Sequence, residues 1–276
     1  MWHHLSRSIY TAVSRLNFVC ECIFSSSLIH FVKMAAYTLA PVSLSDSEDL
    51  SRNNISAFWQ NPNWVLAWKH STLEKQIDIT TKRYPRRLIS DHATARHQKA
   101  IDPETGRLVG YARWVLPESY ATAVDGESTW PEALGPVVGP EEAEEIKRIA
   151  EATPLNASNE TDHLDDNVSK IKKELLEGKT YFILEYLAVH PDNQGKGIAT
   201  LLVQSGMKEA EKLGLDIFVL AFRHGWGVYG RLGFNIEREL IQDDSMYGGD
   251  GNYGVRYMIY KQPLKSEVLT DEQKSL

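Results

Sequence analysis

Apolar and polar residues follow patterns along the chain that predict a mixed α/β fold. Residues 181–189 and 216–222 are runs of apolar, aromatic and β-branched residues, which are typical of buried strands. Between these runs, apolar residues recur at helical spacing from Ile198 to Leu213, and charged residues such as Lys208 occupy the opposite side. This region is therefore expected to form a strand, a loop, a helix and a second strand.

The N-terminal half carries weaker signals of the same kinds. Residues 37–42 are expected to form a first strand. Ser45 or Asp46 is expected to cap a helix that ends at about Trp59, because short polar side chains satisfy the free N–H groups of a helix start. A second helix is predicted over residues 64–73.

Two hairpins are predicted from turn residues that separate apolar runs. Residues 95–101 and 108–115 are joined by an Asp-Pro-Glu-Thr-Gly segment, which is a hairpin signal. Residues 248–251, Gly-Gly-Asp-Gly, resemble a phosphate loop but precede no helix. They are therefore predicted to be a long hairpin turn between the last strands.

A glycine-rich loop lies between the strand at 181–189 and the helix at 198–213. Residues 190–193, His-Pro-Asp-Asn, are expected to end the strand. Gly195 and Gly197 follow where the helix begins, and there unpaired N–H groups and the helix dipole favour an anion such as a diphosphate. The loop has neither the Gly-Lys-Ser/Thr of a Walker A motif nor the three glycines of the dinucleotide fingerprint, which disfavours both nucleotide classes.

Two short motifs lie on either side of the strand predicted at 216–222. Gln194, Gly197 and Ala199 match the pattern Q/R-x-x-G-x-G/A. About thirty residues further on, the stretch from Tyr229 to Phe234 matches the signature Tyr-x-x-x-Gly-Phe. With both motifs in their expected structural context, the chain resembles the GNAT superfamily of acyl-CoA N-acyltransferases.

The resemblance extends over about residues 37 to 262, apart from one insertion. It implies an α/β fold with a GNAT-type mixed, largely antiparallel twisted sheet, flanked by helices, whose fourth and fifth strands splay apart. It also implies an N-acetyltransferase that uses acetyl-CoA as co-substrate, needs no metal, and acetylates a primary amine directly. A small-molecule amine is the expected acceptor. A protein N-terminus or lysine, or a catalytically silent acyl-CoA-binding module, is the alternative.

The resemblance places cofactor binding at the end of the fourth strand and in the glycine loop. It implies a β-bulge near residues 187–189, where a backbone N–H stabilises the oxyanion and the strand pairs with the pantetheine arm. The loop amides would bind the diphosphate, and the Thr200 hydroxyl would add a contact. Lys196 is either a point charge at this site or a solvated surface lysine. The residues assigned to cofactor binding are Leu187, Ala188, Val189, Gln194, Gly195, Lys196, Gly197, Ile198, Ala199 and Thr200.

Two residues are assigned to proton transfer. Tyr229 is the expected acid for the leaving thiolate, because a phenol is protonated at neutral pH; its alternative role is core packing. Glu185 is the expected base, acting through water, because a carboxylate within an apolar strand requires a partner or a function. Strand alternation places it on one face with Leu187, opposite its two neighbours. His190, His224 and a chain of solvent molecules are the alternatives to Glu185.

The chain departs from the family pattern at one point and is ambiguous at another. Many members carry an asparagine near the start of the tyrosine helix, whereas residues 222–226 here are Phe-Arg-His-Gly-Trp, so contacts to the pantetheine arm are unassigned. An aromatic cluster on the first helices is expected to be core packing, with a wall of the acceptor pocket as the alternative. Its members are Phe58, Trp59, Trp64 and Trp68.

Composition limits the remaining function classes. The chain has 276 residues, of which 42% are hydrophobic, and this suffices for a single large core over residues 34–262. A formal net charge of −7 argues against binding to nucleic acid, and no window approaches the roughly 18 apolar residues of a membrane span. Cys20 and Cys22 suggest neither a metal site nor a disulfide framework.

Three segments lie outside the expected core. Residues 1–33 are basic and serine-rich, so they are either a mitochondrial transit peptide or an extension ahead of Met34. The extension is the favoured interpretation, and it predicts a cytoplasmic or nuclear protein. Residues 263–276 form a polar tail. Residues 118–178 hold 15 acidic residues against 5 basic ones. This insertion is expected to be a solvated, partly disordered excursion, with a lid that attracts a cationic amine as the alternative.

Overall fold

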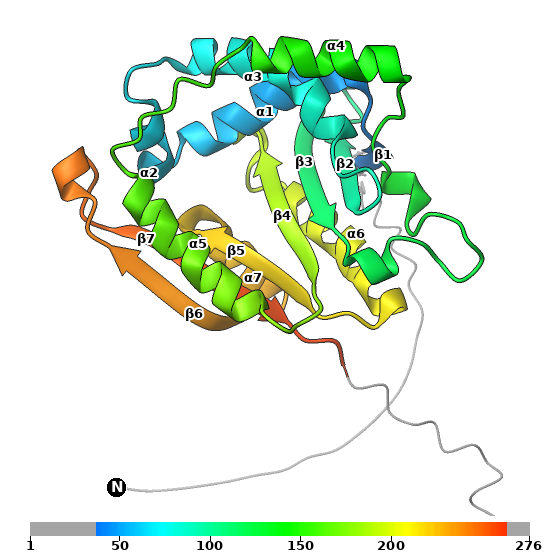
Figure 1. Cartoon of the computed structure of the whole chain (residues 1–276). Helices are drawn as coiled ribbons and strands as arrows, with labels where there is room; N and C mark the ends of the chain where they lie inside the picture. The colour runs from blue at the N-terminus through cyan, green and yellow to red at the C-terminus, as the bar shows by residue number, and fades with distance from the viewer. Residues whose placement is uncertain (1–36, 264–276) are drawn as a thin grey trace, which may run out of the picture. The chain divides into compact units, whose positions relative to one another are not determined.

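A computed structural model describes residues 37–263, and in this part of the chain seven strands form one mixed sheet (Figure 1). The strands lie in the order β1-β2-β3-β4-β5-β7-β6, and every neighbouring pair is antiparallel except the parallel pair β4 and β5. This arrangement confirms the predicted fold class. The strands are β1 (Thr38–Pro41), β2 (Ala95–Ile101), β3 (Leu108–Val115), β4 (Phe182–Val189), β5 (Ile217–Phe222), β6 (Asn235–Gln242) and β7 (Tyr253–Tyr260). The helices are α1 (Ser47–Trp59), α2 (Pro62–Val65), α3 (Leu73–Ile89), α4 (Pro140–Glu151), α5 (Asp162–Leu176), α6 (Ile198–Leu213) and α7 (Arg223–Arg231).

The helices cover both faces of the sheet. On one face, Trp114 and Val219 belong to the core that also contains residues of α6 and α7. On the other face, Tyr111 packs with α1 and α3, and Phe218 packs with α5. Figure 1 shows α5 crossing in front of β5 while α6 lies behind β3 and β4. Side chains of α6 and α7 can therefore reach a site between β4 and β5 from one face of the sheet, and side chains of α1 and α5 can reach it from the other face.

Strands β4 and β5 pair over a short stretch and then separate. Their pairing runs from Phe182↔Ile217 to Leu184↔Val219. Beyond Leu184, β4 continues to Val189 without β5 as a partner, while β5 remains paired with β7. The predicted splay of the fourth and fifth strands is therefore confirmed.

The β-bulge of β4 lies at Glu185, and its predicted place at Leu187, Ala188 and Val189 is wrong. Strand β3 pairs Arg113 with Tyr186 and the next residue with Leu184, so Glu185 is left without a partner residue. An extra residue also shifts the alternation of side chains.

The shift in alternation corrects the predicted facing of the β4 side chains. Leu184 and Leu187 pack into the same core, whereas Tyr186 packs on the opposite face with Tyr111. The expectation that Leu184 and Tyr186 share a face is therefore wrong. Strict alternation fails here because the bulge puts two residues where a regular strand has one.

The first strand, the first helix and the 95–115 hairpin are close to their predicted positions, but the second helix is not. The short helix α2 ends at Val65, and α3 begins at Leu73, where the predicted helix was expected to end. The Thr72 side chain accepts a hydrogen bond from the Lys75 N–H at 3.2 Å and so caps α3. This 17-residue helix is rich in basic residues and contains Pro85. Because its apolar face is also narrow, its helical pattern is hard to recognise in the sequence.

The acidic insertion is folded, so the favoured expectation of a solvated, partly disordered excursion is wrong. Helix α4 packs against α3 and buries Ile146 and Ala150. Helix α5 buries Leu164, Val168 and Leu175 against the sheet. The acidic residues of α4 and α5 lie on the exposed sides of these helices. Because their apolar sides pack against α3 and the sheet, both helices are part of the fold.

The remaining expectations fall partly outside the described residues. The leader at 1–33, with both cysteines, and residues 264–276 of the polar tail lie in the parts that the structure does not describe. Gly248 to Gly251 belong to the connection between the antiparallel strands β6 and β7, as predicted. Within residues 37–263, no helix is long and apolar enough to cross a membrane.

Candidate active site

The glycine loop presents free backbone N–H groups at the start of α6. Gly195 and Gly197 have positive φ angles of 76° and 82°, and Gly197 is the N-cap residue. The first helical bond runs from the Leu201 N–H to the Gly197 carbonyl at 3.0 Å, so the three N–H groups before Leu201 have no helical partner. No acidic side chain lies in the first turn, and a Cβ at either glycine would meet nothing within 4 Å. The loop is therefore open and suited to an anion.

The free edge of β4 faces the gap left by β5. The His190 N–H donates to the Val109 carbonyl of β3 at 3.2 Å. Backbone groups of a strand point alternately to its two neighbours, so those of Leu187 and Val189 point away from β3 and into the splay. The Gln194 side chain donates to the Val189 carbonyl at 3.3 Å and ties the loop to this edge. The remaining groups are placed to pair with an extended amide chain.

Asn53 fixes the end of β4, and sequence reasoning missed it. Its amide nitrogen donates to the Ala188 carbonyl at 3.3 Å, and its amide oxygen accepts from the His190 N–H at 2.9 Å. Asn53 and Asn54 are both buried in α1. Two adjacent asparagines within an amphipathic helix were the available signal, because buried amides require partners.

One cavity of about 560 Å³ brings the predicted residues together. It extends from the glycine loop through the splay to α1 and α5. Lys196 does not line it, and its Nζ donates to the Asn193 side chain at 2.9 Å. The predicted site residues that line the cavity are Glu185, Leu187, Ala188, Val189, Gln194, Gly195, Gly197, Ile198, Ala199, Thr200 and Tyr229.

Tyr229 reaches the cavity from α7 and is 5% exposed. Its ring packs against Phe234 with centroids 5.5 Å apart, so it also contributes to the core. Burial raises the pKa of Tyr229, which keeps the hydroxyl protonated at neutral pH. The glycine at position 225 leaves room for the Tyr229 ring, because a Cβ there would lie 2.8 Å from the Tyr229 Cε2 atom.

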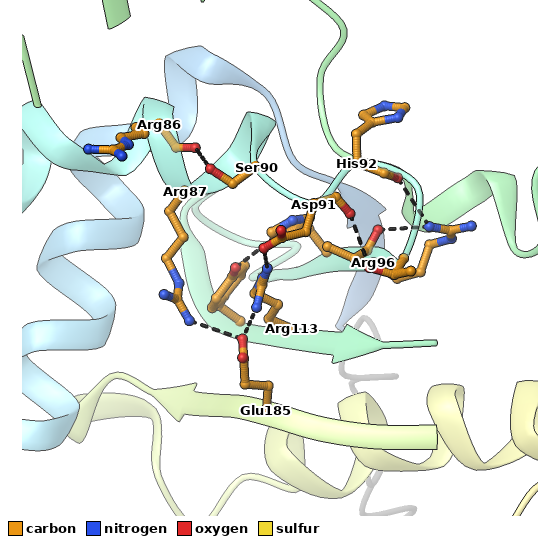
Figure 2. Close-up of polar contacts among 12 residues, drawn as sticks. Arg86, Arg87, Ser90, Asp91, His92, Arg96, Arg113 and Glu185 are labelled. Atoms are coloured by element: carbon orange, nitrogen blue, oxygen red, sulfur yellow. Dashed lines mark hydrogen bonds and ion pairs between the residues drawn. The ribbon is translucent and has the colours of Figure 1, made fainter. Parts of the chain in front are cut away.

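Glu185 lies in a network of arginines that the sequence did not reveal (Figure 2). Its Oε2 atom accepts from Arg87 at 3.1 Å and also from Arg113. Arg113 donates in addition to the Asp91 carboxylate at 3.0 Å. Burial, followed by the charge of Arg87, lowers the pKa of Arg113. The bulge thus directs the carboxylate to a fixed position on the α3 side of the sheet.

The two histidines proposed as alternatives to Glu185 occupy different environments. His190 is the N-cap of the turn that follows β4, where its Nδ1 accepts from the Asp192 N–H at 3.4 Å, and it does not line the cavity. His224 does line the cavity. Arg223 points to Asn252 and lies over the Trp226 ring at 5.3 Å, outside the cavity.

One ring of the half-buried aromatic cluster reaches the cavity. Phe58 lines the cavity, whereas Trp59, Trp64 and Trp68 do not. The Trp64 ring lies 5.9 Å from Phe58, 6.0 Å from Trp59 and 5.3 Å from Trp68. The three tryptophans therefore support the single ring that reaches the site.

Comparison with known proteins agrees with this arrangement of loop, splay and tyrosine. The model of the acetyltransferase (GNAT) family matches residues 155–234, which include β4, α6, β5 and α7. Residues 155–234 are thus similar to the GNAT acetyltransferase family, whose members use acyl-CoA. No curated protein matches the chain in sequence.

Two solved structures share the fold. One is a histone acetyltransferase HPA2 and related acetyltransferase from Corynebacterium glutamicum. It is 15% identical to this chain, the match covers 85% of this chain and 100% of that chain, and the TM-score is 0.51. The other is arylalkylamine N-acetyltransferase 2 from Aedes aegypti, with 15% identity, 82% and 99% covered, and a TM-score of 0.50. At such low identity the likeness shows the fold alone.

Proposed function

We propose that the protein is an N-acetyltransferase that moves an acetyl group from acetyl-CoA directly to a primary amine of a small molecule. The observation that carries this proposal is a single cavity lined by the anion-binding loop, the free edge of β4 and the Tyr229 side chain. Acetyl-CoA would supply an activated thioester. The chain's own residues bind it, orient the two substrates and move the protons.

The loop and the β4 edge fit coenzyme A. The open N–H groups at Ile198, Ala199 and Thr200 suit a diphosphate, and no carboxylate in the first turn of α6 opposes it. The backbone of Leu187 and Val189 suits the amides of a pantetheine arm, which would add to the sheet like a short strand. An N–H group of this edge would also stabilise the oxyanion, a contribution typically worth about 3 kcal/mol.

Tyr229 and Glu185 are proposed to move the protons. The protonated Tyr229 hydroxyl donates to the leaving thiolate. Glu185 accepts a proton from the incoming amine through water, and its Oε1 atom is the one that the two arginines leave available. Arg87 and Arg113 hold the carboxylate in place, so its main contribution is a fixed orientation of the water and the amine. Lys196 is proposed as a surface residue.

A small acceptor is favoured by the walls on the α1 side of the cavity. Phe58 contacts Tyr186 of β4 and Phe222 of β5, with centroids 4.9 and 6.4 Å apart, and so closes the splay on that face. Helix α5 adds Lys172 to the same cavity. The two fold relatives carry names that point to an arylalkylamine and to a histone, so the fold does not choose the acceptor. The aromatic wall favours a compact amine over a protein segment.

Calorimetric titration of the full chain with acetyl-CoA tests cofactor binding. Gly197→Asp and Gly197→Asn impose similar backbone strain at a positive φ, but only Asp adds a negative charge beside the diphosphate. Two unit charges 4 Å apart repel by about 4 kcal/mol at an effective dielectric constant of 20. We expect Gly197→Asp to lose binding and Gly197→Asn to stay within about tenfold of wild type. Folded wild type that binds no acetyl-CoA would contradict the proposal.

Tyr229→Phe separates an enzyme from a silent binding module. In an enzyme the variant should turn over a primary amine at least about a hundredfold more slowly, because general acid catalysis contributes about 10²–10⁴. Its affinity for acetyl-CoA should be nearly unchanged, since the ring remains. Acetylation measured by mass spectrometry at saturating acetyl-CoA checks this expectation. Equal rates in both proteins would remove Tyr229 from the mechanism.

A further inference from the structure

The part of the cavity on the α1 and α5 side combines an aromatic wall with one lysine. Phe58 comes from α1, Tyr186 from β4 and Phe222 from the end of β5, and all three rings line the cavity. Lys172 comes from α5, which covers β5 on the same face of the sheet (Figure 1). This side of the cavity therefore presents an apolar surface and a cation together.

Lys172 lies on the inward side of its helix and has no partner in the part of the chain that the structure describes. It follows the buried Val168 by one helical turn and precedes the buried Leu175 by three residues. The side chain is half-buried, and it makes no hydrogen bond or ion pair within residues 37–263. No carboxylate occupies the positions three or four residues away on α5. Burial lowers the pKa of Lys172, which expresses the cost of removing an unpaired ammonium group from water.

The other charged groups in the cavity do not neutralise Lys172. Among the described residues that line the cavity, Glu185 is the only carboxylate, and Arg87 and Arg113 already bind it. His224 and Arg231 add no negative charge. The insertion at residues 118–178 is acidic overall, but the side chain that it contributes to the site is a cation. A lid that attracts an ammonium group was expected to contribute negative charge instead.

We propose that the acceptor is a primary amine that also carries a carboxylate, which pairs with Lys172, and an apolar body that packs against Phe58. This inference rests on the proposed function, because it names the substrate class of the same site. The ammonium group of Lys172 attracts the acceptor's carboxylate and disfavours a second cation nearby. An acceptor amine held there is shifted toward its neutral form, which is the form that attacks the thioester.

The test compares two amides that differ only in a carboxylate. N-acetyl-L-phenylalanine and N-acetyl-2-phenylethylamine are titrated by calorimetry into the full chain saturated with coenzyme A. Wild type should bind the acid at least about tenfold more tightly. Lys172→Met keeps the length of the side chain without its charge and should abolish the preference, whereas Lys172→Arg should retain most of it.

Lys173→Met is the matched control, because Lys173 is the next residue on α5 and is exposed. It should bind both amides like wild type. Equal affinities in wild type, no binding of the acid, or a preference that survives Lys172→Met would each overturn the proposal.

A failure of the acceptor class is distinguishable from a failure of the proposed function. Acetylation of L-phenylalanine and of 2-phenylethylamine at equal rates would retain the acetyltransferase and refute the role of Lys172. If wild type does not bind acetyl-CoA, the proposed function fails. The affinities of the two amides for wild type and Lys172→Met are then measured on the chain without coenzyme A. If wild type shows no preference for the acid there, the inference is overturned as well.

Discussion

Gly206 of α6 lies directly against Trp114 of β3, and a single methyl group there should destabilise the protein. An ideal Cβ at Gly206 would overlap the six-membered ring of Trp114 well inside 3.0 Å, at atoms Cζ2, Cε2 and Cη2. Trp114 has an exposed fraction of 0%. Its ring stacks on Phe182 at 4.9 Å and meets Trp130 edge-on at 6.3 Å, so it has no space to retreat.

Two opposing effects decide the magnitude for Gly206→Ala. Replacing glycine by alanine inside a helix stabilises the helix by about 1 kcal/mol. Overpacking a tight core costs about 1–3 kcal/mol, and the upper end applies because both the ring and the helix backbone are confined. We therefore expect a net loss of about 2 kcal/mol, which lowers Tm by roughly 4–8 °C in a domain of this size.

Urea unfolding followed by far-ultraviolet circular dichroism measures the effect. Gly230→Ala in α7 is the matched control, because a Cβ there meets nothing within 4 Å. That variant should be as stable as wild type or up to about 1 kcal/mol more stable. If Gly206→Ala proved as stable as Gly230→Ala with an unchanged m-value, α6 would be free to move away from Trp114, and the packing argument would be refuted.

Two further predictions concern the buried polar groups. Burial lowers the pKa of His97 to about 3 from 6.5, so the unfolded chain binds a proton that the folded chain does not. Stability should therefore fall by about 1.4 kcal/mol per unit as the pH drops from about 6.5 toward 3; urea midpoints between pH 7 and 5 check this, and a slope unaffected by His97→Gln would contradict it. Asn53→Ala should cost about 1–3 kcal/mol and weaken coenzyme A binding, because it removes the side-chain hydrogen bonds to the Ala188 carbonyl and the His190 N–H and leaves the end of the cofactor strand less firmly held. Ser51→Ala in the same helix removes only a hydrogen bond to the Ser47 carbonyl and should retain the affinity; calorimetry that finds equal losses of affinity in both variants would exclude a specific role for Asn53.

The sequence predicted the parts of the site that depend on local chemistry. Gly195 and Gly197 occupy positive φ angles ahead of a helix, and both requirements are visible in a short window of residues. The resemblance to the Tyr-x-x-x-Gly-Phe signature of the GNAT superfamily singled out Tyr229, which lies in α7. These elements need no information about distant partners.

The parts that depend on pairing between distant segments were not predictable from the same patterns. The extra residue at Glu185 is defined only relative to its partner strand, so alternation along β4 alone misplaced the bulge. Arg113 and Arg87 lie 72 and 98 residues from Glu185, and nothing local connects them. The acidic composition of the insertion concealed the helical spacing of Leu164, Val168 and Leu175, which is enough to anchor α5.

The bulge at Glu185 connects the architecture of the sheet to the proposed chemistry. Pairing between β4 and β5 ends at Leu184, the residue immediately before the bulge, and a bulge bends its strand and increases the local twist. The same extra residue places its own carboxylate against Arg113 and puts Tyr186 on the face where Phe58 closes the cavity. Beyond it, the backbone of Leu187 is left without β5 as a partner. The opening in the sheet, the fixed carboxylate and the free strand edge are therefore consequences of one inserted residue rather than three separate features.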